Sequence, residues 1–102
     1  CEKINDKYVV YGMGNFLSNQ SPSQDRTLTP SNEDGTINTF TVQEVSPGVF
    51  RTTSFVYTPT RVVIPGHRIV PSTPEAHPAS YERTVTAMNL LGPGSCDGRP
   101  EF

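Results

Sequence analysis

The sequence lacks the residue patterns that mark membrane proteins and nucleic-acid-binding proteins. No run of apolar residues approaches the roughly 18 that a membrane-spanning helix requires. Its eight basic and ten acidic residues give a net charge of −2 and are scattered in runs no longer than two. Because no basic stripe is interleaved with aromatic residues, we expect no nucleic-acid partner.

Motifs for metal binding and covalent catalysis are also missing. The only two histidines, His67 and His77, each stand beside glycine or proline, without a His-x-His or His-Glu-x-x-His spacing. A metal site needs further ligands in a defined geometry. No serine has the surroundings of a nucleophile elbow, and no glycine-rich phosphate loop occurs. We therefore assign no catalytic residue, no metal ligand and no cofactor to this chain itself.

Apolar residues are scarce for a chain of 102 residues, at 33% of the total. With the eight glycines added, the share still falls below the ~45–50% that is usual for a globular domain on that count. Ten prolines and eight glycines predict a loop-rich chain. This length allows one domain at most, and its apolar residues suit part of a larger core better than a complete one.

The two cysteines, Cys1 and Cys96, stand near opposite ends of the sequence. Their separation excludes the close spacing of a zinc ribbon or of a thioredoxin-type redox pair. Two alternatives stay open. Either a disulfide ties the C-terminal tail to the first strand, as an exported protein would allow, or both thiols are unpaired.

The middle of the chain predicts a β-hairpin over residues 36–58. Both arms are rich in β-branched residues, and the turn at 46–48 reads Ser-Pro-Gly. Alternation along the second arm places Phe50 and Phe55 on opposite faces. Pro59 should end this strand or place it at an edge, because proline cannot donate to a sheet.

Two further segments flank the hairpin. Residues 18–35 form a long polar loop without periodicity, which is either a flap beside a site or a disordered insertion. Residues 78–91 predict a helix, since Pro78 suits the first helical position and a Gly-Pro stop signal follows. Its apolar stripe consists of Tyr81, Val85, Met88 and Leu91. The tail, 92–102, shows no periodicity and should be irregular.

The most informative stretch is a strand that runs into a glycine-punctuated turn. Residues 7–12 contain four consecutive aromatic or β-branched residues and predict a buried strand. Gly12 and Gly14 then permit backbone conformations that other residues disfavour, and they display Asn15. One interpretation is the rim of a site. The other is a plain bend in which Asn15 satisfies local backbone groups.

This stretch, YVVYGMGNFLSNQ, resembles a strand ending in Ser-Leu-Gly-Asn-Phe that is found in bacterial capsule-synthesis proteins of the poly-γ-glutamate (CapA) type. Gly14, Asn15 and Phe16 match, whereas Gly12 and Met13 replace the usual serine and leucine. The later segments FVYTPTRVVIPGHRIVP and ASYERTVTAMNLLG resemble the tail of actinobacterial members more loosely. The resemblance covers most of the chain.

The resemblance implies a calcineurin-like metallophosphoesterase fold, in which this chain supplies an α+β, mainly β portion: strands of a partial β-sandwich with one amphipathic helix. The metal ligands of such proteins lie in upstream motifs that this sequence lacks. Residues 1–102 would then be one C-terminal piece of a larger domain. The start at Cys1, without an initiator methionine or signal peptide, agrees with that expectation.

In that setting Gly14, Asn15 and Phe16 would lie close to substrate, beside a two-metal centre, with Asn15 orienting substrate or a metal ligand. The piece alone would not be an enzyme, while the larger protein would be a metal-dependent phosphoesterase-like hydrolase holding divalent ions. These residues do not decide between phosphoester hydrolysis and a role in polyglutamate assembly.

The same resemblance implies the upstream part of the protein and the capsule polymer machinery as partners, with an extracellular or cell-envelope location. The alternative is an exported β-rich binding or structural module without catalysis. In either case, exposed sheet edges offer a route to self-association.

Overall fold

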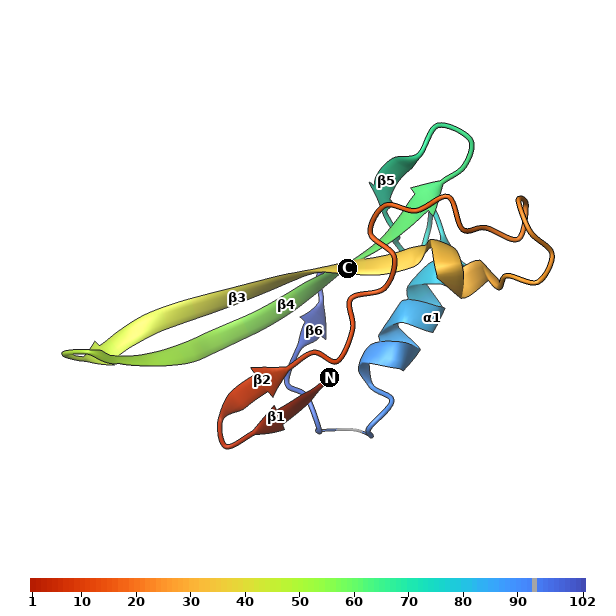
Figure 1. The fold of residues 1–102 in the computed structure, drawn as a ribbon. Helices are drawn as coiled ribbons and strands as arrows, with labels where there is room; N and C mark the ends of the chain where they lie inside the picture. Colours follow the sequence, from red (N-terminus) through yellow and green to blue (C-terminus); the bar gives the residue numbers. More distant parts are fainter. Residues whose placement is uncertain (93) are drawn as a thin grey trace.

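The computed structural model of this chain describes residues 1–92 and 94–102. Its dominant feature is an antiparallel ribbon of two long strands, β3 (Asp34–Ser46) and β4 (Val49–Val63). The outer half of this ribbon projects far from the rest of the chain (Figure 1), and the molecule measures 52 × 27 × 24 Å. At its base, β4 also pairs with β5 (Arg68–Pro71) and, in parallel, with β6 (Arg99–Pro100).

The other elements gather at the base of the ribbon (Figure 1). They are a small hairpin of β1 (Glu2–Ile4) and β2 (Lys7–Val9), a 3-10 helix η1 (Pro30–Glu33) and the helix α1 (Pro78–Met88). The described residues are therefore mainly β with one α-helix, and the predicted α+β, mainly β class is confirmed. None of their helices is long and apolar enough to span a membrane.

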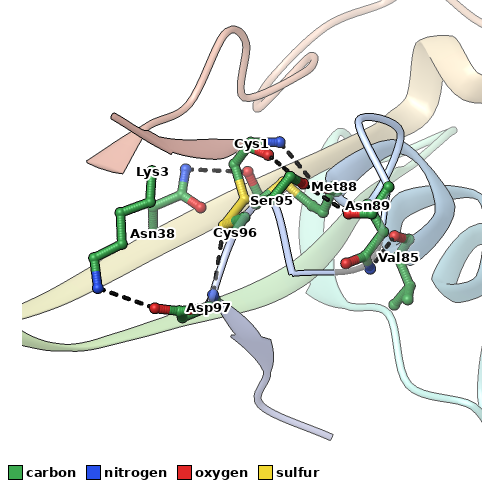
Figure 2. Close-up of a disulfide and its surroundings, with 12 residues drawn as sticks. Cys1, Lys3, Asn38, Val85, Met88, Asn89, Ser95, Cys96 and Asp97 are labelled. Atoms are coloured by element: carbon green, nitrogen blue, oxygen red, sulfur yellow. Dashed lines mark hydrogen bonds and ion pairs between the residues drawn. A yellow bond between two sulfur atoms is a disulfide. The ribbon is translucent and has the colours of Figure 1, made fainter. Parts of the chain in front are cut away.

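The buried core is small and lies where the ribbon meets α1. It consists of Cys1, Phe55, Tyr57, Met88 and Cys96, with Tyr8, Val10 and Val85 packed against it. Cys1 and Cys96 form a disulfide with their Cα atoms 5.5 Å apart, so the structure contains the bridged alternative (Figure 2). The disulfide thus joins the start of the chain to its C-terminal tail. The N-terminal ammonium of Cys1 also donates to the carbonyl of Met88 at the end of α1 (2.8 Å).

The first strand differs from its prediction. Only Lys7–Val9 are extended as a strand, and they pair with β1 rather than with the large sheet. Asn5 and Asp6 both adopt positive φ (48° and 60°), which closes a tight two-residue turn between β1 and β2. Because this hairpin is short, the apolar run extends beyond it, and Tyr11 is 67% exposed. The prediction of a buried strand over 7–12 is therefore wrong.

We expect Tyr11→Ala to leave the urea midpoint of unfolding almost unchanged. The Tyr11 ring is mostly in water, and its hydroxyl donates to the exposed carboxylate of Glu2, an interaction of little net value at a surface. Tyr57→Ala is the matched comparison, because Tyr57 is fully buried and its loss should cost about 3–5 kcal/mol. Equal losses for the two variants would contradict this placement of Tyr11.

The ribbon carries a bulge that changes which side chains share a face. Pairing with β3 moves from Ser54 to Thr52, so that Thr53 is an extra residue on β4. Such a bulge reverses the alternation of the strand that carries it. Phe50 and Thr52 therefore share a face with Phe55, and the prediction that Phe50 and Phe55 face opposite ways is wrong.

Pro59 lies inside β4 rather than at its end, so the predicted end of the strand is wrong, whereas the alternative of an edge position agrees with the absence, among the described residues, of a strand partner on one side. The opposite residue, Thr36, donates its N–H to the carbonyl of Met13 (2.9 Å) instead of across the ribbon, so no ladder bond to Pro59 is expected there. On its other side, Pro59 falls in the gap between β6 and β5. Its carbonyl still accepts a hydrogen bond from the Ser72 N–H (2.8 Å).

The helix begins as predicted, with Pro78 in its first turn, but it ends at Met88 instead of residue 91. Its buried residues are Ser80, Thr84 and Met88, whereas Leu91 is exposed. The predicted stripe is therefore correct only at Met88 and, in part, at Val85, because a polar network described below draws Ser80 inward.

Two segments expected to be irregular are partly ordered. The loop 18–35 ends in η1 and the start of β3. Within it, buried Ser21 donates its hydroxyl to Glu33 (2.5 Å), and the ion pair of Glu33 with Arg61 attaches the loop to β4. The tail 92–102 contains β6 and the disulfide. Its Pro93, half of the predicted stop signal, lies outside the described residues.

Candidate functional site

The glycine turn lies along the edge of β3 at the base of the ribbon. Gly14 forms an isolated bridge with Gly35, and the Asn15 N–H donates to the carbonyl of Asp34 (3.0 Å). Gly14 has a positive φ of 72°, and a Cβ there would collide with the Asp34 backbone. Only glycine suits this position, and the turn is therefore fixed against the sheet.

The side chain of Asn15 is used locally. Its Nδ2 donates to the carbonyl of Asn32 (2.9 Å) and to Oε1 of Gln20 (3.2 Å). These bonds hold the long loop and η1 against the turn. Phe16, in contrast, is 48% exposed. The arrangement matches the second interpretation of this motif, in which Asn15 satisfies neighbouring backbone.

A cleft of about 160 Å³ separates the turn from α1. Its lining includes Met13, Gly14, Asp34, Arg83, Thr84 and Met88. Of the three residues predicted to approach a substrate, Gly14 lines this cleft, while Asn15 and Phe16 do not. The cleft is mainly apolar, with its charged groups at the junction of β3 and α1.

Those charged groups form a buried network around Asp34. The Asp34 carboxylate, in a residue only 8% exposed, accepts hydrogen bonds from the Ser80 hydroxyl (2.6 Å) and from Arg83 Nε (2.7 Å) and Nη2 (3.0 Å). The two-pronged contact is the strong geometry of an arginine–carboxylate pair. The hydrogen bond to Asp34 raises the pKa of Arg83 above its ordinary value, against the lowering effect of burial.

A second ion pair joins the last residue of η1 to β4. Arg61 contacts the Glu33 carboxylate, which also accepts from Ser21. Arg61 is therefore already paired with a carboxylate. The two adjacent acids, Glu33 and Asp34, point to different arginines on different elements and do not form a catalytic pair.

His77 lines a pocket with Glu33, Arg61 and Arg83, whereas His67 is not among the residues that line it. His67 lies in the β4–β5 turn, where its Nε2 is 2.7 Å from Oδ1 of Asn19. His77 precedes the first residue of α1. Within residues 1–92 and 94–102, no group of three His, Cys, Asp or Glu side chains is arranged to hold a metal ion. The charged residues that line the cleft, Asp34 and Arg83, are paired with each other.

Sequence reasoning did not identify Asp34, Ser80 and Arg83 as a network. Asp34-Gly35 has the composition of a turn, and 49 residues separate Asp34 from Arg83. The one available signal was a helical spacing of three between Ser80 and Arg83, which places both on one face of α1. Comparisons of this chain with models of known protein families, with curated proteins and with solved structures found no match.

Proposed function

We propose that this chain is the C-terminal segment of a capsule or poly-γ-glutamate synthesis-type protein. In that role it completes a metallophosphoesterase-like β-sandwich whose metal ligands lie in the preceding part of the protein. The resemblance of residues 8–20 supports the family. The structural observation that carries the proposal is the largely exposed apolar face of the projecting ribbon.

The projecting ribbon carries large apolar side chains that the rest of the chain covers only in part: the Tyr8 ring lies 5.8 Å from the Phe40 ring, and the β1–β2 turn lines an open pocket with Val42 and Phe50. Beyond the core, Phe40, Val42 and Phe50 continue the face of Phe55 and are 41%, 58% and 57% exposed. Exposed apolar residues also occur elsewhere on the ribbon, at Ile37, Val45 and Val49. Contiguous apolar surface of this kind marks an interface. A strand pair in a sandwich buries its inner face against a second sheet.

In the complete sandwich, the preceding part of the protein would supply the second sheet and a pair of divalent metal ions. Such a centre polarises a phosphate group and generates a hydroxide nucleophile. This chain's contribution would be structural and positional. Gly14 anchors the turn on β3, and the exposed ring of Phe16 is available to contact the missing part. A disulfide is consistent with an extracellular or cell-envelope location.

The deciding experiment measures the metal content of the protein extended upstream from Cys1, by elemental analysis after its folding has been checked. We expect two transition-metal ions per extended chain. The 102-residue chain alone serves as the control and should retain none. A folded extended protein that holds no metal after reconstitution would overturn the catalytic part of the proposal.

A pair of ribbon variants tests the structural part. Phe50→Ser and Thr53→Ala both alter exposed residues of β4 and should leave the melting temperature of the 102-residue chain nearly unchanged. In the extended protein, Phe50→Ser should lower the melting temperature by several degrees because its ring would be buried there, whereas Thr53→Ala should not. Equal behaviour of the two variants in the extended protein would favour an exported binding module instead.

A further inference from the structure

The outer edge of β3 is unpaired along most of its length. Residues 13–15 cover this edge only at Asp34–Thr36. From Asn38 to Ser46, no described residue pairs with β3 on the side away from β4. The Thr36 N–H points away from β4. N–H direction alternates along a strand. The N–H and C=O groups of Asn38, Phe40, Val42 and Glu44 therefore face the solvent.

From Asn38 to Glu44, before the register shift between Glu44 and Ser46, this edge also lacks the features that usually prevent strand pairing. Natural edges are protected by lysine, proline, bulges or shortness. Between Asn38 and Glu44, β3 is regular and carries neither lysine nor proline. Its single charge, on Glu44, is turned toward the hairpin tip, where the carboxylate accepts the Gly48 N–H (2.8 Å). The free edge of β4 differs, because the Thr53 bulge interrupts it.

We infer that the β3 edge pairs antiparallel with the same edge of a second copy of this chain, forming a two-fold symmetric dimer. Antiparallel pairing places the two bodies at opposite ends, as the projecting ribbon permits (Figure 1). The bare edge runs from Asn38 to Ser46, and its midpoint is Val42. A two-fold axis at Val42 places Val42 opposite its own copy and Glu44 opposite Phe40, so no like charges face each other.

A second copy is favoured over an unrelated partner because the edge is nearly neutral and self-complementary. The dimer uses backbone groups of the edge and leaves the apolar face available, so it is compatible with the proposed sandwich and does not depend on it. Two-fold dimers are also the commonest assemblies of soluble chains.

The test is a dilution series of the full 102-residue chain, with mass measured by light scattering after size exclusion. We expect a dimer at high concentration that dissociates on dilution. Val42→Pro removes one outward N–H from the proposed interface and should raise the dimer dissociation constant at least about tenfold. Thr52→Pro is the matched control: Thr52 lies opposite Val42 on the other strand, so the variant carries the same local strain away from the interface.

A cysteine at the axis gives an independent measurement. Val42→Cys should form a covalent dimer in oxidising buffer, because directly opposed strand residues lie within disulfide reach. Thr52→Cys should not do so. A wild-type chain that stays monomeric throughout the series would overturn the inference. Equal weakening by the two proline variants, or equal cross-linking by the two cysteine variants, would also overturn it.

Discussion

Replacing both Cys1 and Cys96 by serine should lower the free energy of unfolding by about 2–5 kcal/mol. The bridge joins residues 95 apart, so it restricts nearly the whole unfolded chain. Both cysteines are also among the few buried apolar residues, and a serine hydroxyl packs less favourably there. Urea unfolding followed by circular dichroism would measure the loss.

Reduction of the wild-type chain is the control for this prediction. If the bridge acts through chain entropy, the reduced wild type and the double serine variant should unfold at similar urea concentrations. A variant as stable as the oxidised protein would mean that Phe55, Tyr57 and Met88 hold the base of the ribbon without help. The small core makes that result unexpected, because a short chain buries little apolar surface.

The elements that depend on neighbouring residues could be predicted. The hairpin turn at Pro47-Gly48 and the helix start at Pro78 both lie where local chemistry placed them. Proline and glycine restrict or widen the backbone choices of their own positions, so such signals do not need the rest of the fold. The α+β class follows from the same local patterns.

Features that depend on distant partners could not be predicted. Pro59 was expected either to end the strand or to place it at an edge, and β4 continues through it because no neighbour requires its missing N–H. Likewise, nothing in the sequence distinguishes Thr53 from the adjacent Thr52. Thr53 is nevertheless the bulged residue, and the bulge places Phe50 on the same face as Phe55. Strand register is set by pairing across the whole ribbon, and one sequence does not display it.

In the candidate cleft, too, the residue with a local sequence signal was predicted and the residues paired over a long distance were not. Gly14 was identified because a strand end with two glycines signals a tight backbone approach, and it does lie against β3. Asp34 and Arg83 were missed because a buried ion pair between distant residues leaves no local pattern. Of the two interpretations of Asn15, the hydrogen bond of its amide to the Asn32 carbonyl agrees with the one in which it satisfies local backbone groups.

The second large effect is expected at Asp34. Asp34→Ala removes the acceptor of three hydrogen bonds and should cost about 3 kcal/mol of unfolding free energy. Most of this loss in stability comes from the hydrogen-bond donors of Ser80 and Arg83, which the substitution leaves without an acceptor. The Ser80 hydroxyl is 1% exposed and cannot reach water, whereas Arg83 is about one-third exposed and can turn partly outward. Thermal and urea unfolding would measure the change.

A double-mutant cycle separates the ion pair from the serine contact. Ser80→Ala in the Asp34→Ala background should recover part of the lost stability, because it removes the unpaired buried hydroxyl. Asp97→Asn is the matched surface control: its bond to Lys3 is exposed and should matter little. If Asp34→Ala proved as mild as Asp97→Asn, the junction of β3 and α1 would not depend on this network, and α1 would be held on the ribbon by Met88 and the disulfide instead.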